Sequence, residues 1–230
     1  YNEEATVAEI IRRLQAQPVV SQIIIVDDGS TDGTCDAVSR WLNDPQVTIL
    51  RHDVNRGKGR AIRTGLEKAC CTFVLIQDAD LEYSPTDIPR LLTQMSSGQA
   101  DVVYGSRYLD NPNLQKGRWI MQSGVKFLNL LVRLLYGLKL TDEATCYKMF
   151  RTADLRAMNL QCQKFEFCPE VTAKAIRRGL RIAEVPISYS ARTHREGKKL
   201  RASDALVAVH VLLGLRYSRS RQVHGLDNQH

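Results

Sequence analysis

Residues 73–85 read FVLIQDADLEYSP, an apolar run that passes directly into three carboxylates within five positions. The first four residues have the composition of a buried strand. Asp78 and Asp80 stand where that strand should end, and Glu82 follows two residues later. Three acids this close repel one another unless a cation or a solvated turn takes up the charge. The stretch therefore predicts a strand followed by either a polar loop or a metal site.

Strand and helix patterns alternate around this stretch. The predicted order is helix 7–14, strand 23–28, helix 38–42, strand 47–50, helix 57–69, strand 73–76, helix 84–95 and strand 101–105. Ser84 is a candidate helix cap, with Pro85 at the first helical position. Alternation at this spacing predicts an α/β fold with a Rossmann-like, doubly wound, mostly parallel sheet and helices on both faces.

Four polar clusters fall at the carboxyl ends of the predicted strands, at residues 27–28, 55–58, 78–80 and 105–107. Ligands of doubly wound sheets collect at this edge. Four clusters at one edge are hard to explain as independent loops, so we expect them to form one site.

The composition fits one globular domain, with 230 residues, of which 43% are hydrophobic and 25% charged. The net charge of +7 and pI near 9.2 favour a polyanionic partner: nucleic acid, an anionic membrane surface or a phosphorylated substrate. Much of the excess lies in residues 191–201, which favours a local anion site. The six cysteines form no CxxC pair, and we expect them to be core thiols in a reducing compartment.

The pattern changes after residue 110. Residues 123–140 form a long apolar helix, 167–179 another helix, and 181–192 a strand pair interrupted at Pro186; a last apolar helix at 204–217 is too short to span a bilayer. The helices at 124–138 and 205–215 either complete the core or lie in a membrane interface, and the sequence gives these alternatives equal weight.

Three groups of residues are candidates for binding or catalysis, and each also has an ordinary structural explanation. Asp78, Asp80 and Glu82 offer hard oxygen ligands suited to Mg²⁺ or Mn²⁺, or form a solvated turn. Asp27 and Asp28 end a strand and accept hydrogen bonds from a base or ribose, or serve turn geometry alone.

Basic residues form the third group. Lys58 lies between two glycines before a helix, where backbone N–H groups could meet an anion, although the P-loop spacing is absent. The other basic candidates are Arg107, Arg118, Arg192, Arg195, Lys198 and Lys199. They are either ordinary surface charge or, for those in the segment around Gly197, part of a flap that closes over a diphosphate.

Seven motifs in order, YNEE, VDDGSTDGT, NRGKGRA, DADLEYSP, GSRY, KMF and EVPISYSAR with EGKK, resemble family 2 glycosyltransferases of the GT-A fold. The chain looks most similar to the polyprenyl- and dolichol-phosphate hexosyltransferase branch, over residues 1–200. The resemblance implies inverting, metal-dependent transfer of a hexose from a nucleotide diphosphate sugar, GDP-mannose or UDP-glucose, to a polyprenyl phosphate at a membrane surface. Mg²⁺ or Mn²⁺ would be the cofactor, and no nucleic acid is involved.

The resemblance also implies roles for single residues. The residues that it implies for nucleotide binding are Tyr1, Glu3, Asp27, Asp28, Lys58 and Asp78, and those for metal binding are Asp78, Asp80 and Glu82. The implied phosphate-binding residues are Arg107, Arg118, Arg192, Lys198 and Lys199. The implied catalytic residues are Asp80, Arg107 and Arg192. Residues 1–200 would form the catalytic domain and 201–230 a C-terminal amphipathic helix and tail. The protein is expected in the cytoplasm, peripheral to the cytoplasmic face of a membrane.

Three departures from the family pattern stand out. The family's first strand would precede Tyr1, at an inner position of the sheet, and residues 141–150 read TDEATCYKMF where many relatives have a glycine before the aromatic residue. The C-terminal transmembrane segments that some members carry are not expected in this sequence. Alternatives remain open: transfer to a sugar or protein hydroxyl, with Asp142 as a base or as a residue that positions a loop; a non-catalytic nucleotide-sugar-binding module; and a sugar nucleotidyltransferase.

Overall fold

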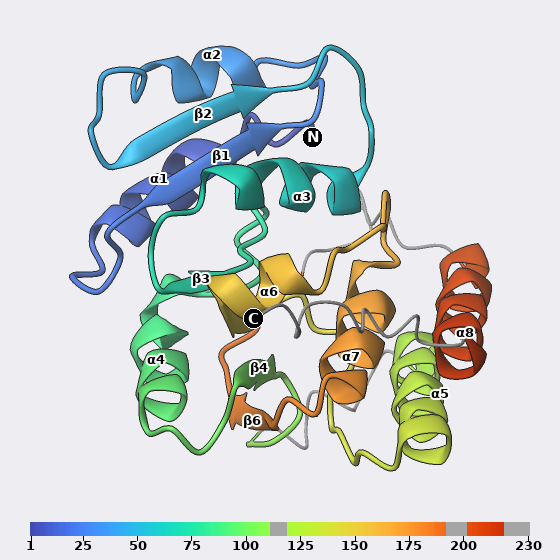
Figure 1. The fold of residues 1–230 in the computed structure, drawn as a ribbon. Helices are drawn as coiled ribbons and strands as arrows, with labels where there is room; N and C mark the ends of the chain where they lie inside the picture. Colours follow the sequence, from blue (N-terminus) through green and yellow to red (C-terminus); the bar gives the residue numbers. More distant parts are fainter. Residues whose placement is uncertain (111–118, 192–201, 219–230) are drawn as a thin grey trace, which may run out of the picture.

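The computed structural model describes residues 1–110, 119–191 and 202–218 (Figure 1). The strands are β1 Ile23–Asp27, β2 Val47–Arg51, β3 Phe73–Leu75, β4 Val102–Ser106, β5 Lys148–Arg151 and β6 Ile182–Pro186. The α-helices are α1 Val7–Gln15, α2 Thr34–Ser39, α3 Lys58–Lys68, α4 Ile88–Ser96, α5 Trp119–Tyr136, α6 Thr152–Ala157, α7 Phe167–Arg177 and α8 Ala202–Tyr217, and a 3₁₀ turn, η1, covers Pro85–Asp87.

The strands pair in two groups. β1 and β2 are parallel, with Ile23 opposite Val47. The second group has the order β3-β5-β4-β6, in which β4 and β6 are parallel and β5 runs antiparallel to both β3 and β4. The predicted strands are confirmed, but β5 was not expected as a strand, and its direction makes the second group mixed.

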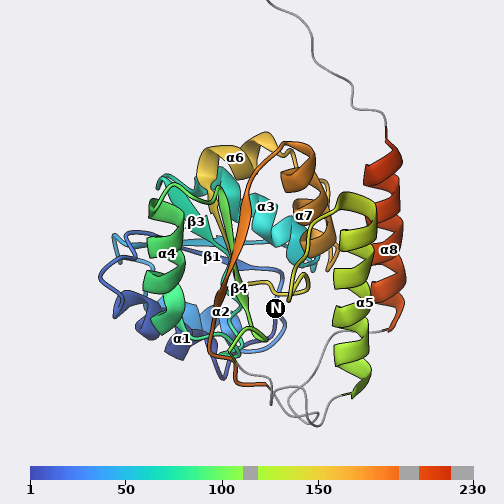
Figure 2. The same ribbon diagram turned by 90° about the horizontal axis from the view of Figure 1, so that it is seen from below.

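Helices cover both faces of the strands, as expected. Seen from below, α1 and α4 lie on one side of the strands, and α3, α6 and α7 lie on the other (Figure 2). Each layer is closed by apolar side chains: Ile11 of α1 and Leu91 of α4 are buried on the first side, and Leu155 of α6 and Val171 of α7 on the second. The α/β fold with covered faces is therefore confirmed.

Two predicted elements differ in detail. Ser84 does cap a turn, its hydroxyl accepting from the Thr86 backbone N–H at 3.4 Å, but the turn is η1, and α4 starts only at Ile88. A second proline, Pro89, then sits in the first turn of α4, where it interrupts no helical hydrogen bond. The expected strand pair around Pro186 is one strand, β6, followed by an isolated bridge between Tyr189 and Tyr83.

α5 and α8 lie side by side in both views (Figures 1 and 2). Val132 of α5 and Leu212 of α8 are fully buried, and the Tyr136 hydroxyl donates to the Leu212 carbonyl at 2.7 Å. The C-terminal helix was expected to be amphipathic, but α8 is apolar around most of its circumference, and on its outer side Leu206 is 74% exposed with other apolar side chains beside it. The proposed domain boundary at residue 200 lies outside the described residues.

Within the described residues, no helix has the length and apolar character required to cross a membrane. Both α5 and α8 nevertheless expose large apolar side chains, which are Phe127, Leu130 and Leu134 of α5 and Leu206, Val207, Leu213 and Tyr217 of α8. One side of these helices therefore completes the core, as one reading expected, whereas the membrane-interface reading of the uncovered side stays a prediction.

Candidate active site

The acids that follow β3 meet the first residue of α3. The Lys58 ammonium donates to Asp78 Oδ1, and both side chains are about one-fifth exposed, at 20% and 23%. Burial alone would lower the pKa of Lys58, but the Asp78 carboxylate and the Cys146 sulfur hold it well above its ordinary value. Lys58 is therefore a charged residue of the site, fixed beside the first acid of the DAD motif.

Asp80 and Glu82 take different directions from Asp78. Leu81 has a φ of 61°, so the chain turns sharply between them, and the Glu82 N–H donates to Asp80 Oδ1 at 3.1 Å. Glu82 Oε2 accepts from the Tyr189 hydroxyl at 2.9 Å. Among the described residues, no three His, Cys, Asp or Glu side chains are gathered closely enough to hold a metal ion.

The oxygen ligands still fit a divalent cation in kind. Mg²⁺ and Mn²⁺ accept a few carboxylates and fill the remaining positions with water and substrate phosphate, so a complete protein cage is not required. Asp78 and Asp80 are half-buried at the end of β3. Glu82 is already bonded to Tyr189, which makes it the less suitable of the three.

Asp28 is used within the protein. Its Oδ1 lies 2.6 Å from His52 Nδ1 and accepts from the Arg56 N–H at 2.9 Å, and its Oδ2 accepts from the Gly57 N–H at 2.7 Å. These bonds shape the loop that delivers Lys58. Asp28 therefore orders the loop before Lys58, and its contact with a nucleotide stays a prediction.

Asp27 and the N-terminal segment form the neighbouring wall. Asp27 Oδ1 accepts from the Ser30 N–H at 3.0 Å, and Arg51 Nε lies 3.4 Å from Asp27 Oδ2. The Glu3 N–H donates to the Thr34 hydroxyl at 2.8 Å, which holds the first residues against the loop after β1. Tyr1 is 41% exposed beside this loop, where its ring is open to a ligand.

Arg107 follows β4 and is buried against Asp142. Its Nε and Nη2 each donate to the Asp142 carboxylate at 2.7 Å, and its backbone N–H donates at 3.1 Å. The guanidinium also lies over the rings of Tyr108 and Tyr189, at 5.6 and 5.1 Å from their centres. Burial opposes the charge, but Tyr83 and Asp142 keep the pKa of Arg107 well above its usual value.

The turn that carries Asp142 is anchored from two elements, β6 and α5. Glu184 of β6 accepts from the backbone N–H groups of Thr141 and Asp142 at 2.8 and 2.9 Å. Asn129 of α5 donates to the Thr141 carbonyl at 2.7 Å and accepts from the Glu143 N–H at 2.8 Å. Asp142 is fully buried and bonded to Arg107, which favours the role of a positioning residue over that of a general base.

The model of the family described as glycosyl transferase family 2 matches residues 1–158, more than half of the chain and all the motifs up to KMF. The chain belongs to glycosyl transferase family 2. It is therefore a glycosyltransferase, and the resemblance seen in its motifs is confirmed.

Relatives of this family 2 glycosyltransferase include two enzymes of prenyl-phosphate chemistry. The chain is 33% identical to an undecaprenyl-phosphate mannosyltransferase of Micrococcus luteus, with 86% of this chain and 84% of the relative covered. It is 28% identical to a polyprenol monophosphomannose synthase of Mycolicibacterium smegmatis, with 84% and 75% covered. These names agree with the branch that the motifs indicated.

A solved structure supports the GT-A fold. Glucosyl-3-phosphoglycerate synthase from Mycobacterium tuberculosis, crystallised with Mn²⁺, UDP-glucose and phosphoglyceric acid, superposes with a TM-score of 0.69 at 19% identity. The match covers 94% of this chain and 76% of the other. The GT-A, Rossmann-like architecture of this family 2 glycosyltransferase is thereby confirmed.

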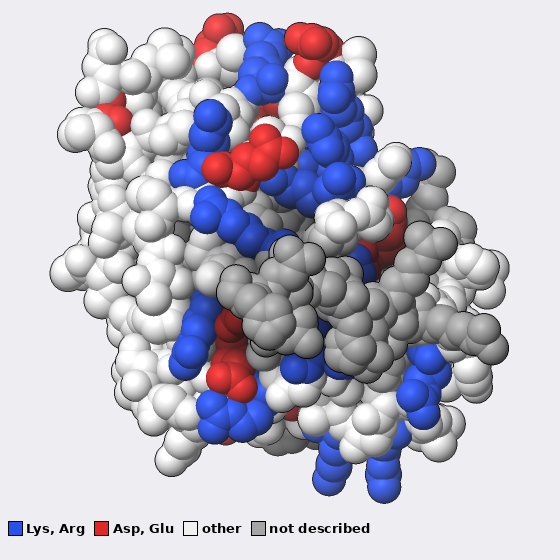
Figure 3. Space-filling view, viewed as in Figure 1, with Lys and Arg blue, Asp and Glu red and all other residues white. Residues whose placement is uncertain are grey.

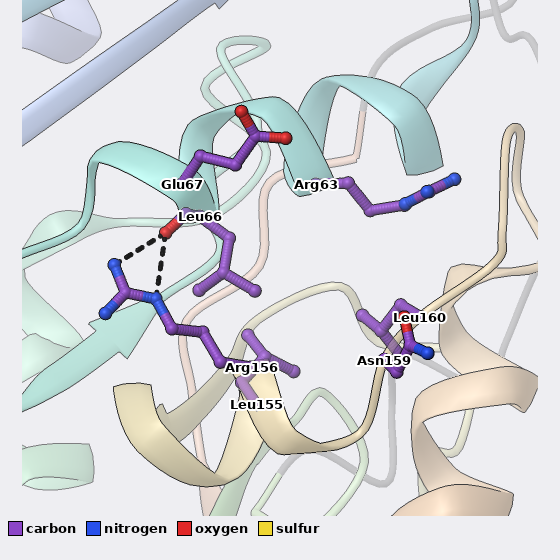
Figure 4. A pocket seen from close by; sticks show the side chains of 7 residues that line it. All are labelled: Arg63, Leu66, Glu67, Leu155, Arg156, Asn159 and Leu160. Atoms are coloured by element: carbon purple, nitrogen blue, oxygen red, sulfur yellow. Dashed lines mark hydrogen bonds between the residues drawn. The ribbon is translucent and has the colours of Figure 1, made fainter.

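A groove between α3 and α6 is separate from this site. It has a volume of about 280 Å³ and is lined by Arg63, Leu66, Glu67, Leu155, Arg156, Asn159 and Leu160 (Figure 4). Arg156 crosses it to donate to the Leu66 carbonyl at 3.0 Å. Since α3 rises about 1.5 Å per residue, Glu67 lies about 13 Å along the helix from Lys58. No predicted site residue of the glycosyltransferase lines this groove.

Four predicted phosphate-binding residues lie outside the described residues: Arg118, Arg192, Lys198 and Lys199. Their roles stay predictions. Other contributors were missed, namely Glu184, Tyr189 and Cys146. Glu184 gave one signal, a single carboxylate within the apolar strand pattern of residues 182–187, whereas Tyr189 and Cys146 gave none.

Proposed function

We propose that this glycosyltransferase moves a hexose, with inversion, from a nucleotide diphosphate sugar to a polyprenyl phosphate. The observation that carries the proposal is the cluster at the ends of β3 and β4, where Lys58 bonds Asp78 beside Asp80 and Asp142 fixes Arg107. The names of the relatives support the prenyl-phosphate acceptor. Transfer to a hydroxyl is less favoured, because it needs a base and Asp142 is occupied by Arg107.

The protein's own residues would act mainly by electrostatics. A phosphate acceptor is already anionic, so no proton need be removed from it before it attacks the sugar. Lys58 and Arg107 would stabilise the charge that develops on the leaving diphosphate. A divalent cation at Asp78 and Asp80 would supply further neutralisation of that diphosphate when bound.

The donor's nucleoside would lie against the loop after β1. Tyr1, which is 41% exposed, would stack on the base, and Glu3, Asp27 and Asp28 would contact the base or the ribose. Both GDP-mannose and UDP-glucose remain candidate donors. The diphosphate would also be bound by four further basic residues, which are Arg118, Arg192, Lys198 and Lys199.

The acceptor would reach the site from a membrane surface. The exposed apolar side chains of α5 and α8 form adjacent strips, and Lys126 and Arg133 flank the strip on α5. Such helices lie in the headgroup region, and basic residues favour anionic lipid. All six cysteines are free thiols, which fits the cytoplasmic face.

Calorimetric titration of the full-length protein with GDP-mannose and with UDP-glucose, each with Mn²⁺ and with EDTA, tests the donor side. We expect one donor to bind only with metal. Transfer of its labelled hexose to a polyprenyl phosphate in vesicles tests the acceptor. Failure of both donors to bind to folded protein, or transfer to a free sugar in preference to the lipid, would contradict the proposal.

A further inference from the structure

Two cysteines meet beside the donor site. Cys146, in the segment before β5, and Cys168, in the first turn of α7, have their sulfur atoms 3.9 Å apart. The residues are 22 positions apart in the chain. Cys168 also donates to the Thr145 carbonyl at 3.3 Å, which keeps its thiol in place.

The two thiols differ in their surroundings. Cys146 is half-buried and close enough to the Lys58 ammonium for the charge of each to affect the other, whereas Cys168 is buried. The contact with the Cys168 thiol, together with the charge of Lys58, lowers the pKa of the Cys146 thiol to about 7, against the opposing effect of burial. The hydrogen bond to Cys146, and burial, raise the pKa of Cys168. One sulfur is thus suited to attack an oxidant and the other to resolve the product.

We propose that Cys146 and Cys168 are a redox-active pair, which a hydroperoxide oxidises to a reversible disulfide that separates Cys146 from Lys58. The chemistry and the Lys58 contact stand without the proposed function, and only the effect on donor affinity rests on it.

The oxidation needs two steps. The Cys146 thiolate attacks one peroxide oxygen, the O–O bond breaks, and a sulfenic acid forms with release of hydroxide, or of an alcohol from an organic hydroperoxide. The Cys168 thiol then attacks the sulfenic sulfur, the S–S bond forms and water leaves. Two thiols have lost two electrons and the peroxide has gained them, and a dithiol reductant reverses the change.

The consequence falls on Lys58. The sulfur atoms must approach to about 2.05 Å, which draws Cys146 toward α7 and away from the ammonium. Lys58 then keeps only Asp78 as its charged partner. Since Cys146 precedes Tyr147, whose carbonyl accepts from the Gly105 N–H at 2.8 Å, the movement also strains the connection to β4.

Peptide mapping of the intact chain tests the pair directly. Reduced protein is exposed to hydrogen peroxide, alkylated and digested without reductant. We expect a Cys146–Cys168 cross-linked peptide that dithiothreitol removes. In Cys168→Ser, dimedone should trap a sulfenic acid at Cys146, and Cys70→Ser, which removes an exposed thiol elsewhere, should leave the cross-link unchanged. Absence of the cross-link in wild-type protein overturns the proposal.

Acetylation of Lys58, read by mass spectrometry, tests the contact without any donor. Movement of Cys146 changes the surroundings of the Lys58 amine, so the rate of its acetylation should differ between the reduced and the oxidised protein. Equal reactivity before and after oxidation overturns the link to Lys58. Donor binding should weaken on oxidation; if the reduced protein also binds no donor, the proposed function fails while the thiol pair stands.

Discussion

At the scale of single residues, Arg107 and Asp142 form an ion pair that is almost fully buried. Asp142→Ala leaves a buried guanidinium without its carboxylate, and breaking such a pair costs about 3–5 kcal/mol. We expect a large decrease in the free energy of unfolding, measured by urea denaturation. Asp101→Ala, which breaks the exposed pair with Arg181, should cost far less. Similar losses from both variants would show that Asp142 does not hold Arg107.

Asp80 presents a different case, because it is half-buried and its replacement leaves no buried charge behind. We expect Asp80→Ala to abolish hexose transfer and the Mn²⁺ dependence of donor binding, with little change in thermal unfolding. Asp36→Ala, at an exposed position of α2, is the matched control. Near-native turnover of the Asp80 variant would rule out the metal role.

At the scale of elements, the start of α3 depends on a backbone conformation that only glycine adopts readily. Gly57 has a φ of 92°, and a Cβ there would lie 2.5 Å from the Gln163 carbonyl oxygen. Gly57→Ala should therefore destabilise the fold by about 1–3 kcal/mol and weaken donor binding, because Lys58 is the next residue. Gly98→Ala is the control, since Gly98 has a φ of 72° but no atom within 4 Å of the added Cβ. Urea denaturation measures the loss of stability, and calorimetry measures the loss of donor binding. The difference between the two variants separates the effect of the clash from that of backbone strain alone.

The exposed outer sides of α5 and α8 lead to a second prediction at the scale of elements. Leu134 is 73% exposed, so Leu134→Glu should change stability by no more than about 0.5 kcal/mol. It should nevertheless reduce sedimentation with anionic vesicles. Leu42→Glu, at a 67% exposed leucine three residues after the end of α2, is the control, because α2 lies far from α5 (Figure 1). An equal effect of both variants, or of neither, would argue against a membrane-facing side.

At the scale of the whole molecule, acid should weaken the join between β4 and β6. Arg181 donates to Asp101 from its side chain and its backbone, and this lowers the pKa of Asp101 from 3.8 to about 2. A carboxyl whose pKa is lower in the folded state stabilises it above the unfolded pKa and loses that effect as the pH falls toward 2. We expect Asp101→Asn to unfold at a lower temperature than wild type at pH 6, with the difference vanishing near pH 2. A constant difference over this range would contradict the assignment.

Charge is unevenly distributed over the molecule. On the face shown in Figure 3, Lys and Arg gather over α3 and above it. α3 itself contributes Lys58, Arg60, Arg63 and Lys68. The expectation that residues 191–201 carry much of the basic excess therefore covers only part of the positive surface.

The fold was predictable wherever local rules decide structure. β1 has an unbroken β-branched run, and α1 has apolar residues at helical spacing, so both follow from sequence alone. β5 could not be predicted, because it is short and begins with Lys148, whose burial depends on the Tyr104 ring 3.8 Å away. Only the folded chain brings those two residues together.

The site was predictable in position and less so in function. The carboxyl ends of the strands predicted Asp78 and Arg107 as neighbours of a ligand; the structure places both residues at this edge, and their contact with a ligand stays a prediction. Sequence could not reveal that Asp28 would be bonded to the loop before α3, or that Arg107 would be paired with a carboxylate 35 positions away. The Cys146–Cys168 contact was missed for the same reason, because close-spaced cysteine motifs say nothing of thiols on separate elements.

Asn129 binds both ends of the turn that positions Arg107, and it belongs to the helix whose other side is uncovered. A rotation of α5 about its axis therefore cannot leave that turn undisturbed. If the acceptor lipid binds at the outer side of α5, as proposed, its arrival and the placement of the Arg107 guanidinium would be mechanically linked. The enzyme would then sense its acceptor before the sugar is released, which would limit wasteful hydrolysis of the donor by water.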